Sequence, residues 1–320
     1  MLVTGAGGFI GSHLTERLVE LGAKTRAMVH YNALGSAGWL DDSPVRKEIE
    51  IIAGDIGDRD SAMLAVKGTE IVFHLASLIA IPYSYRAPAS YVHTNVEGTL
   101  NVLQAARDAG VARVVHTSTS EVYGTAQYVP IDEKHPLRGQ SPYSASKIGA
   151  DKIAESFHLS FGLPLVTVRP FNTYGPRQSA RAVIPTIITQ CLTGSVVRLG
   201  NLRPTRDLNY VADTANGFVK AAEVPEAVGR TINLGSGKEI SIGDLGNLIA
   251  RLCGREITIE SDEQRERPDD SEVERLLADN TLARTILGWE PTTSLEDGLV
   301  QTTAWLRQHL NRYQPDVYTI

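Results

Sequence analysis

The sequence has little cysteine and no long hydrophobic segment. Its 320 residues include only two cysteines, Cys191 and Cys253, which form neither a CxxC pair nor a metal-type spacing. Two thiols in a chain this long are typical of a reducing compartment rather than of a disulfide scaffold. Nowhere do about 18 apolar residues follow one another, and Met1–Gly5 contains no basic segment followed by an apolar run. We therefore expect a cytoplasmic protein without a signal peptide or a membrane span.

The chain also lacks a strong charge of one sign. It has 31 Lys and Arg against 37 Asp and Glu, so its formal net charge is −6, and it contains no basic block. Such a chain is a poor nucleic-acid binder, although a helix N-terminus and a few arginines suffice to bind a phosphate locally. The eight histidines are scattered without HExxH or another ligand spacing, so we expect no metal site.

Short apolar runs alternate with helical patterns through the first half of the chain. Strands are expected at 1–4, 25–30, 48–53, 70–76, 113–117 and 165–169. Helices are expected between them at 13–22, 61–67, 91–109 and 141–161. This alternation predicts an α/β fold with a doubly wound, mostly parallel sheet, in which a ligand lies at the carboxyl ends of the strands. The second half is less regular, and no linker separates it from the first.

A glycine-rich turn follows the first expected strand. Residues 4–11 read Thr-Gly-Ala-Gly-Gly-Phe-Ile-Gly and lead directly into a helical pattern. In a dinucleotide-binding turn one glycine makes the tight turn, one lets the pyrophosphate approach, and one lets the helix pack on the strand. Gly5, Gly8 and Gly11 fit these three positions, and the helix N-terminus then faces the phosphates. We predict a dinucleotide cofactor in contact with these glycines and with Phe9 and Ile10.

The residues that would select NAD or NADP leave that choice open. The strand over 25–30 runs into His-Tyr-Asn at 30–32, without an acidic residue for the ribose 2′-hydroxyl or an arginine for a 2′-phosphate. Asp55, after the next strand, can accept a hydrogen bond from the adenine amine or can cap the following helix. We predict NAD, with NADP open, and place Ile56, Leu75 and Ala76 beside the cofactor as well.

One expected helix carries a candidate base. Tyr143 and Lys147 lie four residues apart, so the phenol and the ammonium share one helical face. Ser141 can cap this helix and Pro142 suits its first position. The lysine charge and the helix N-terminus both favour the phenolate form of Tyr143, which can then act as a base near neutral pH.

A second polar segment follows the strand expected at 113–117. It reads Ser-Thr-Ser-Glu-Val-Tyr-Gly over 118–124, so that its hydroxyls and carboxylate stand at the carboxyl end of a strand. Thr119 can hydrogen-bond a substrate hydroxyl, Glu121 is a candidate general base, and Ser120 lies between them. Alternatively, these side chains only satisfy the backbone or face solvent.

Together these motifs resemble the extended short-chain dehydrogenase/reductases that modify nucleotide sugars. The resemblance also includes Arg-Pro-Phe-Asn-Thr-Tyr-Gly-Pro-Arg at 169–177 and reaches Leu-Gly-Trp-Glu-Pro at 287–291. Within the family the chain looks most like the 4,6-dehydratases. Residues 75–85, with 31–32 and 38–41, resemble the legionaminic-acid-pathway dehydratases that act on nucleotide-linked N-acetylglucosamine.

The resemblance implies a two-part architecture. A Rossmann-type dinucleotide-binding domain is expected over 1–172, and about 206–235 return to it. A smaller, interleaved α/β substrate-binding cap is expected over 173–320, with the active site in the cleft between them. The resemblance also implies a homodimer in which the helices at 91–109 and 141–161 pair with those of a second subunit.

The resemblance assigns roles to the candidate residues as well. Thr119, Tyr143 and Lys147 form the catalytic triad, and Glu121 removes the C5 proton of the sugar. Ser120 stands where glucose 4,6-dehydratases have Asp, so the proton donor to the departing C6 hydroxyl stays open. The candidates for substrate contact are Ser77, Tyr83, Asn172, Arg206 and Arg267, with Arg177 and Arg181 as weaker ones. An arginine suits a diphosphate because the guanidinium donates in a fork.

The implied reaction converts UDP- or GDP-N-acetylglucosamine into the 4-keto-6-deoxy sugar. Tyr143 takes the 4-hydroxyl proton as C4 gives a hydride to NAD⁺, and Glu121 takes the C5 proton. Water leaves from C6, the hydride returns to C6, and C5 is reprotonated. A 4-epimerase, which has no necessary use for Glu121, is one alternative on this fold. A UDP-glucuronate decarboxylase, which shares Ser-Thr-Ser-Glu, is another. A catalytically silent nucleotide-sugar sensor and a simple dehydrogenase are further possibilities.

Overall fold

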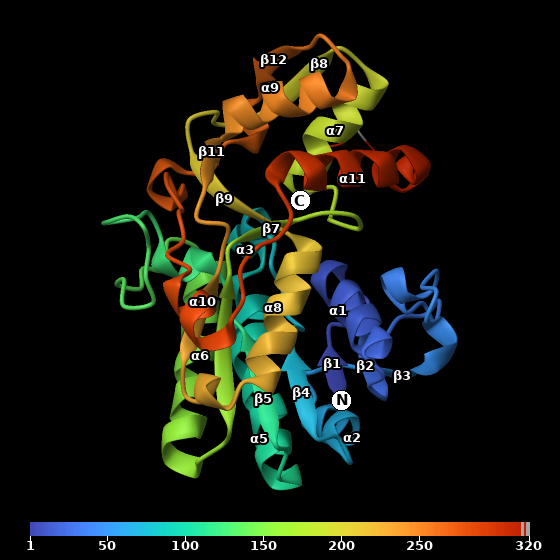
Figure 1. Ribbon diagram of the computed structural model, residues 1–320, viewed down its shortest axis with the longest axis vertical. Helices are drawn as coiled ribbons and strands as arrows, with labels where there is room; N and C mark the ends of the chain where they lie inside the picture. The colour runs from blue at the N-terminus through green and yellow to red at the C-terminus, as the bar shows by residue number, and fades with distance from the viewer. Residues whose placement is uncertain (315–316, 318–320) are drawn as a thin grey trace.

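The computed structural model describes residues 1–314 and residue 317. Seven strands form one parallel sheet in the order β3-β2-β1-β4-β5-β6-β10 (Figure 1). The strands are β1 (Leu2–Thr4), β2 (Thr25–His30), β3 (Ile49–Gly54), β4 (Ile71–His74), β5 (Arg113–Thr117), β6 (Leu165–Pro170) and β10 (Thr231–Leu234). This strand order is that of a doubly wound Rossmann-type sheet, so the predicted fold class is confirmed.

Helices cover both faces of this sheet. One layer contains α1 (Phe9–Glu20) and α8 (Val211–Glu223), and the other contains α2 (Arg59–Val66), α5 (Gly98–Ala109) and α6 (Pro142–Phe161). Neighbouring strand residues belong to opposite layers: in β4, Phe73 packs in the core under α1 and α8, and Val72 packs in the core under α2, α5 and α6. Burial of both faces explains why these strands read as continuous apolar runs.

The helix expected at 141–161 ends as its sequence predicts. Ser141 and Ser144 form a capping box at the N-terminus of α6, Pro142 is its first residue, and Gly162 closes it in the left-handed conformation. The helix expected at 91–109 is less regular. It consists of α4 (Pro88–Tyr91), a π-helical segment over Val92–Glu97, and α5. Pattern spacing does not reveal the extra residue per turn in a π-helical segment.

The C-terminal half builds a cap over one end of the large sheet (Figure 1). Its strands form a three-stranded sheet, β11-β9-β7, and a parallel pair, β12 and β8. Its strands are β7 (Asn172–Tyr174), β8 (Val196–Leu199), β9 (Thr205–Tyr210), β11 (Glu239–Ser241) and β12 (Thr258–Ser261). Helices α7 (Val183–Thr193), α9 (Ile242–Cys253) and α11 (Leu295–Gln308) share one apolar core with these strands. Between β9 and β11 the chain returns to the large sheet through α8 and β10, and α10 (Thr281–Leu287) packs on both.

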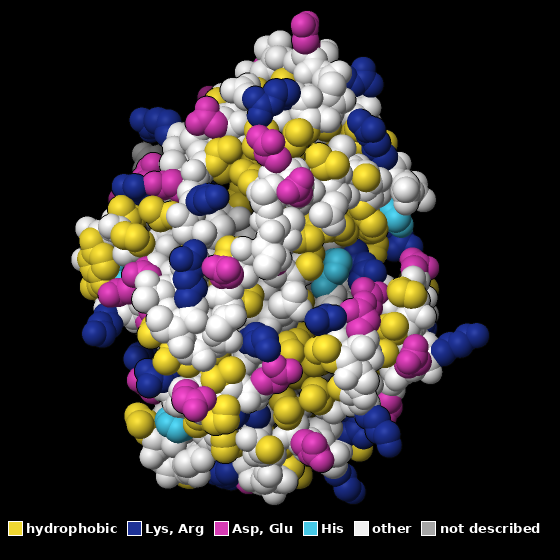
Figure 2. Space-filling view, viewed as in Figure 1, with side chains coloured by type: hydrophobic (Ala, Val, Ile, Leu, Met, Phe, Trp, Pro, Cys, Tyr) yellow, Lys and Arg dark blue, Asp and Glu magenta, His cyan; other side chains and the backbone are white. Residues whose placement is uncertain are grey.

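The surface of the described chain carries no concentrated charge on the face shown in Figure 2, where acidic and basic side chains are interspersed. No helix within residues 1–314 and 317 is long and apolar enough to cross a membrane. In the same residues, no group of three or more His, Cys, Asp or Glu is placed to hold a metal ion.

Candidate active site

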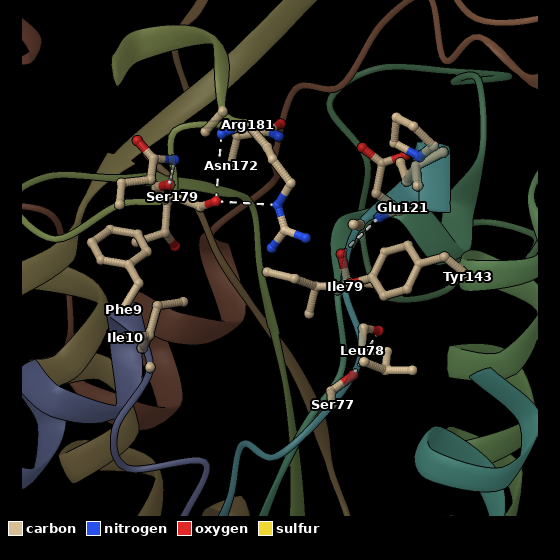
Figure 3. Close-up of a pocket in the computed structure, with 18 of the residues that line it drawn as sticks. Phe9, Ile10, Ser77, Leu78, Ile79, Glu121, Tyr143, Asn172, Ser179 and Arg181 are labelled. Carbon is tan, nitrogen blue, oxygen red and sulfur yellow. Dashed lines mark hydrogen bonds between the residues drawn. The ribbon is translucent and has the colours of Figure 1, made fainter. Parts of the chain in front are cut away.

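A cleft of about 1920 Å³ opens between the carboxyl ends of the central strands and the cap. Figure 3 shows two walls of it. One carries Ser77, Leu78, Ile79, Glu121 and Tyr143, and the other carries Phe9, Ile10, Asn172, Ser179 and Arg181. The cleft extends from the glycine turn at Gly5 to Arg267 in the cap. The topology thus brings together residues from β1, β4, β5, β6 and the cap.

The glycine turn at one end of the cleft has no room for side chains. Gly5 has a φ of +70°, and a Cβ on it would lie 2.8 Å from the backbone of Ala76. A Cβ on Gly11 would fall against the carbonyl oxygen of Gly5, where α1 approaches β1. Gly8 precedes α1 without a side-chain cap, so the first N–H groups of the helix face the cleft. This cradle fits the pyrophosphate of a dinucleotide.

Asp55 lies in the same end of the cleft and does not cap the following helix. Its Oδ1 accepts a hydrogen bond from the N–H of Gly57 at 2.8 Å, and half of its side chain is exposed. The cap of α2 is Asp58, which accepts from the N–H of Ser61. The helix-cap interpretation of Asp55 is therefore wrong. Ile56, Leu75 and Ala76 also line the cleft.

Thr119 and Glu121 follow the end of β5 and meet Tyr143, in the first turn of α6, at the cleft; Figure 3 shows Glu121 and Tyr143 side by side. The Thr119 hydroxyl accepts from the N–H of Glu121 at 3.2 Å and hydrogen-bonds to the Tyr143 phenol. All three side chains line the cleft, as does Ser120, and each residue is less than one-tenth exposed. A phenol, a hydroxyl and a carboxylate therefore face one substrate space.

Burial dominates the electrostatics of this group. It raises the pKa of the Tyr143 phenol well above its usual range, and the hydrogen bond from Thr119 only partly opposes the shift. The lowered pKa expected for Tyr143 from its spacing to Lys147 is therefore not found. The Lys147 ammonium donates to the carbonyl of Thr117 at 2.6 Å. Burial lowers the pKa of Lys147 to about 8, and the charge of Asp151 opposes that shift.

A buried polar network behind these residues was not predicted from the sequence. The Asp151 carboxylate accepts from the Ser118 hydroxyl at 2.7 Å and from Arg169 at 2.9 Å, and it pairs with the His116 ring at 3.0 Å. Burial raises the pKa of Asp151, but the His116 hydrogen bond and the Arg169 charge outweigh it and lower the pKa to about 2. The sequence signal that could have predicted this network is Asp151 itself, an acidic residue one turn beyond Lys147 on the same helical face.

Two arginines and one asparagine lie at the cap end of the cleft. Arg206, on β9, and Arg267 both donate to the carboxylate of Glu272, at 3.0 and 3.5 Å. The Oδ1 of Asn172 is buried without a hydrogen-bond partner in the described structure. The two guanidinium groups form an arrangement that can bind a diphosphate, and the side chain of Asn172 lines the same cleft. Glu272 was not singled out from the sequence.

The remaining substrate candidates separate into two groups. Ser77 lines the cleft, and its hydroxyl donates to the side chain of Asn95 at 3.0 Å. Tyr83 does not line it, because the residues of α3 (Ile81–Arg86) that face the cleft are its neighbours and Tyr83 is 41% exposed. Arg181 extends into the open space of the cleft (Figure 3), whereas Arg177 forms a bidentate ion pair with Glu16 of α1.

The fold and the cleft define an enzyme class that combines a dinucleotide cradle with a Thr-Tyr-Lys group and a cationic cap. Comparison with known proteins agrees with this class. The family model described as GDP-mannose 4,6-dehydratase matches residues 2–302. The chain belongs to this family of nucleotide-sugar dehydratases and epimerases within the extended short-chain dehydrogenase/reductases, as the sequence motifs predicted.

The chain is similar to relatives with two different activities. It is 36% identical to a dTDP-glucose 4,6-dehydratase from Streptomyces griseus, covering 98% of this chain and 96% of the relative. It is 34% identical to a UDP-glucose 4-epimerase from Mycolicibacterium smegmatis, covering 96% and 98%. The structure of the dTDP-glucose 4,6-dehydratase DesIV from Streptomyces venezuelae, which contains NAD, aligns with a TM-score of 0.88 at 30% identity and covers 98% of each chain.

Proposed function

We propose that this protein is a nucleotide-sugar 4,6-dehydratase that acts on UDP- or GDP-linked N-acetylglucosamine. The observation that carries the proposal is Glu121, a buried carboxylate that lines the cleft beside Thr119 and Tyr143. Oxidation and reduction at C4 need only a base and a cofactor. Elimination of water across C5–C6 also needs a base for the C5 proton, and Glu121 supplies it.

NAD is the cofactor that the glycine cradle would hold. Gly5, Gly8 and Gly11 would receive its pyrophosphate at the N-terminus of α1, with Phe9 and Ile10 beside it. Asp55 would bind at the adenine end of the cleft, and Leu75, Ala76, Tyr143 and Lys147 would lie along the rest. When bound, NAD supplies the temporary oxidation of the sugar at C4.

The residues of the chain supply the proton transfers of the proposed reaction. Tyr143 takes the 4-hydroxyl proton in its phenolate form, which the nearby Lys147 charge stabilises before the transfer and which becomes the neutral phenol on accepting the proton. Thr119 orients the 4-hydroxyl through its own hydroxyl. The 4-ketone acidifies the C5 proton, and Glu121 removes it. Ser120 or Glu121 protonates the departing C6 hydroxyl. Because the sugar is reduced again at C6 and C5 is reprotonated, the net change is the loss of one water.

The diphosphate of the substrate would bind at the cap end of the cleft. Arg206 and Arg267 line the cleft there, and the side-chain NH2 of Asn172, which also lines the cleft, could donate to a phosphate oxygen. This placement puts the sugar between the diphosphate and Tyr143.

A 4-epimerase is the second candidate, favoured by the similarity to the UDP-glucose 4-epimerase relative. The two reactions share Thr119, Tyr143 and Lys147 and differ in the need for Glu121. A UDP-glucuronate decarboxylase is a third possibility, because the guanidinium of Arg181 lies in the cleft without an ion pair among the described residues. That cation could bind a sugar carboxylate.

The test is incubation of the purified protein with NAD and each of UDP-N-acetylglucosamine, GDP-N-acetylglucosamine and UDP-glucuronate, followed by mass spectrometry. The proposal expects a product that has lost one water, with no net reduction of the cofactor. The rate of this reaction should fall about 10²–10⁴-fold in Glu121→Gln. Glu155→Gln, an exposed carboxylate on α6, is the matched control. An unchanged mass with an altered C4 configuration would establish the epimerase, and loss of carbon dioxide the decarboxylase.

We also propose a homodimer formed through α5 and α6. These helices pack on each other, and the end of α6 exposes Leu159 by 74% and Phe161 by 54%. Two large apolar side chains on one helix end suit a contact with a second copy. Light scattering of wild type and of Leu159→Glu with Phe161→Glu tests this: the wild type should have twice the mass of the variant.

A further inference from the structure

Glu272 brings the two arginines of the cap together. Its Oε1 accepts from Arg206 Nη2 at 3.0 Å and from Arg267 Nη1 at 3.5 Å. The same oxygen accepts from the N–H of Val273 at 3.1 Å. One carboxylate oxygen therefore holds two guanidinium groups that would otherwise repel each other.

The position of Glu272 is set by its backbone. Its carbonyl accepts from the side chains of Thr125 and Gln140, both at 3.3 Å. The preceding Ser271 donates its hydroxyl to the carbonyl of Gln140 at 2.7 Å. The segment is thus hydrogen-bonded to loops that flank Glu121 and Tyr143. These bonds fix the backbone from which the Glu272 carboxylate faces the cleft.

Arg206 needs a negative neighbour because it is buried. Its side chain is 9% exposed, and burial lowers the pKa of its guanidinium, a shift that the charges of Glu121 and Glu272 oppose. Together with Arg267, the group carries two positive charges and one negative charge. Glu272 therefore halves the net charge that a diphosphate meets in this wall.

We propose that Glu272 is a positioning residue of the diphosphate subsite, which orders Arg206 and Arg267 and weakens their hold on a nucleoside diphosphate so that the nucleotide can leave. The proposal rests on the assignment of this subsite under the proposed function. Two roles of one side chain are involved. Its oxygen arranges the arginines, and its charge competes with the phosphates for them.

The two roles are separated by two substitutions. Glu272→Gln keeps an oxygen acceptor for the arginines and removes the charge, so UDP or GDP should bind at least about threefold more tightly than to the wild type. Glu272→Ala removes the acceptor too, so the arginines separate and binding should be at least about threefold weaker than in Glu272→Gln. Glu274→Gln, an exposed acid two residues further on, is the matched control and should leave affinity unchanged.

The measurement is calorimetric titration of the purified proteins with UDP, GDP and dTDP at low and high salt. The affinity gained by Glu272→Gln should be smaller at high salt, because salt screens the larger net positive charge that the substitution leaves on the two arginines. A merely structural role for Glu272 would not change this salt dependence. Unchanged or weaker binding in Glu272→Gln overturns the proposal. If the wild type binds none of the three nucleotides, or if Arg206→Gln leaves binding unchanged, the assignment of the diphosphate subsite is wrong. The role inferred for Glu272 is then wrong as well.

Discussion

Lys147 and Asp151 lie one turn apart on α6 and both are buried, Lys147 in the lining of the cleft and Asp151 behind it. Lys147 donates to the carbonyl of Thr117, and Asp151 accepts from Ser118, so the two residues hold adjacent positions where β5 ends. Thr119, the next residue, hydrogen-bonds to Tyr143. The helix that carries the phenol and the strand end that carries its hydroxyl partner are therefore joined through this pair.

The pair predicts an alkaline limit to activity. The pKa of Lys147 is lowered to about 8 by burial, and Asp151 holds it from falling further. Activity, measured as kcat/KM, should fall as the pH rises through about 8, where the ammonium loses its charge. In Asp151→Asn this fall in kcat/KM should occur at lower pH. Asp108→Asn, which changes an exposed carboxylate, should leave the pH of the fall unchanged. A fall at the same pH in Asp151→Asn would show that Asp151 does not support the charge of Lys147.

The same carboxylate should contribute to stability. Asp151→Asn leaves the buried Arg169 without its charged partner, so the free energy of unfolding at pH 7 should fall by about 3–5 kcal/mol. The folded pKa of Asp151, about 2, lies below its ordinary value of 3.8. The stability gained from ionisation is therefore present above about pH 4 and lost as the pH falls toward 2. Urea unfolding across this range should show the loss in wild type and not in the variant.

Two buried histidines should make the fold sensitive to milder acid. Burial is the largest cause that lowers the pKa of His74 and of His116, which face each other across β4 and β5 at 5.9 Å between ring centroids. Because the folded pKa lies below the ordinary 6.5, the unfolded chain takes up protons first, and stability falls as the pH drops below about 6.5. His74→Gln should flatten this part of the stability curve. A curve identical to wild type would contradict the assignment.

Gly11 should be indispensable to the cofactor cradle. An alanine there would push α1 away from the carbonyl of Gly5, at a cost of about 1–3 kcal/mol in stability and about tenfold or more in NAD affinity. Gly243→Ala is the control, because it also lies in the first turn of a helix and its Cβ would meet nothing nearer than 3.6 Å. Thermal unfolding and NAD titration measure the two effects. Equal NAD affinity in Gly11→Ala and wild type would argue against pyrophosphate binding at this turn.

The Tyr143 phenol should be required for chemistry and not for binding. Tyr143→Phe keeps the ring contact with Tyr91 and removes the hydroxyl, so kcat should fall by about 10²–10⁴-fold while nucleotide affinity stays within about twofold. Tyr128→Phe removes an exposed hydroxyl that donates to Asp132 and should keep full activity. Steady-state kinetics with the substrate found by mass spectrometry provide the measurement. Full activity in Tyr143→Phe would remove Tyr143 from the mechanism.

Elements with local signals were predictable from the sequence, and elements that depend on distant partners were not. The α6 helix carries its own boundaries in Ser141, Pro142 and Gly162, and the structure reproduces them. Tyr83 was expected at the substrate, but which side of the short helix α3 faces the cleft depends on packing against other elements. A six-residue helix has too few turns for periodicity to decide this.

The sequence by itself determined the sheet, the glycine cradle, the Tyr-x-x-x-Lys pair and the family, because each depends on spacing within a short segment. Only the tertiary structure decided the electrostatics of the site. Glu272 contacts Arg206, which is 66 residues away in the sequence, and Asp151 contacts His116, which is 35 residues away. No local sequence pattern predicts either pair. The pKa of Tyr143 illustrates the reason: spacing to Lys147 predicts a lowered value, but burial, which the whole fold creates, raises it.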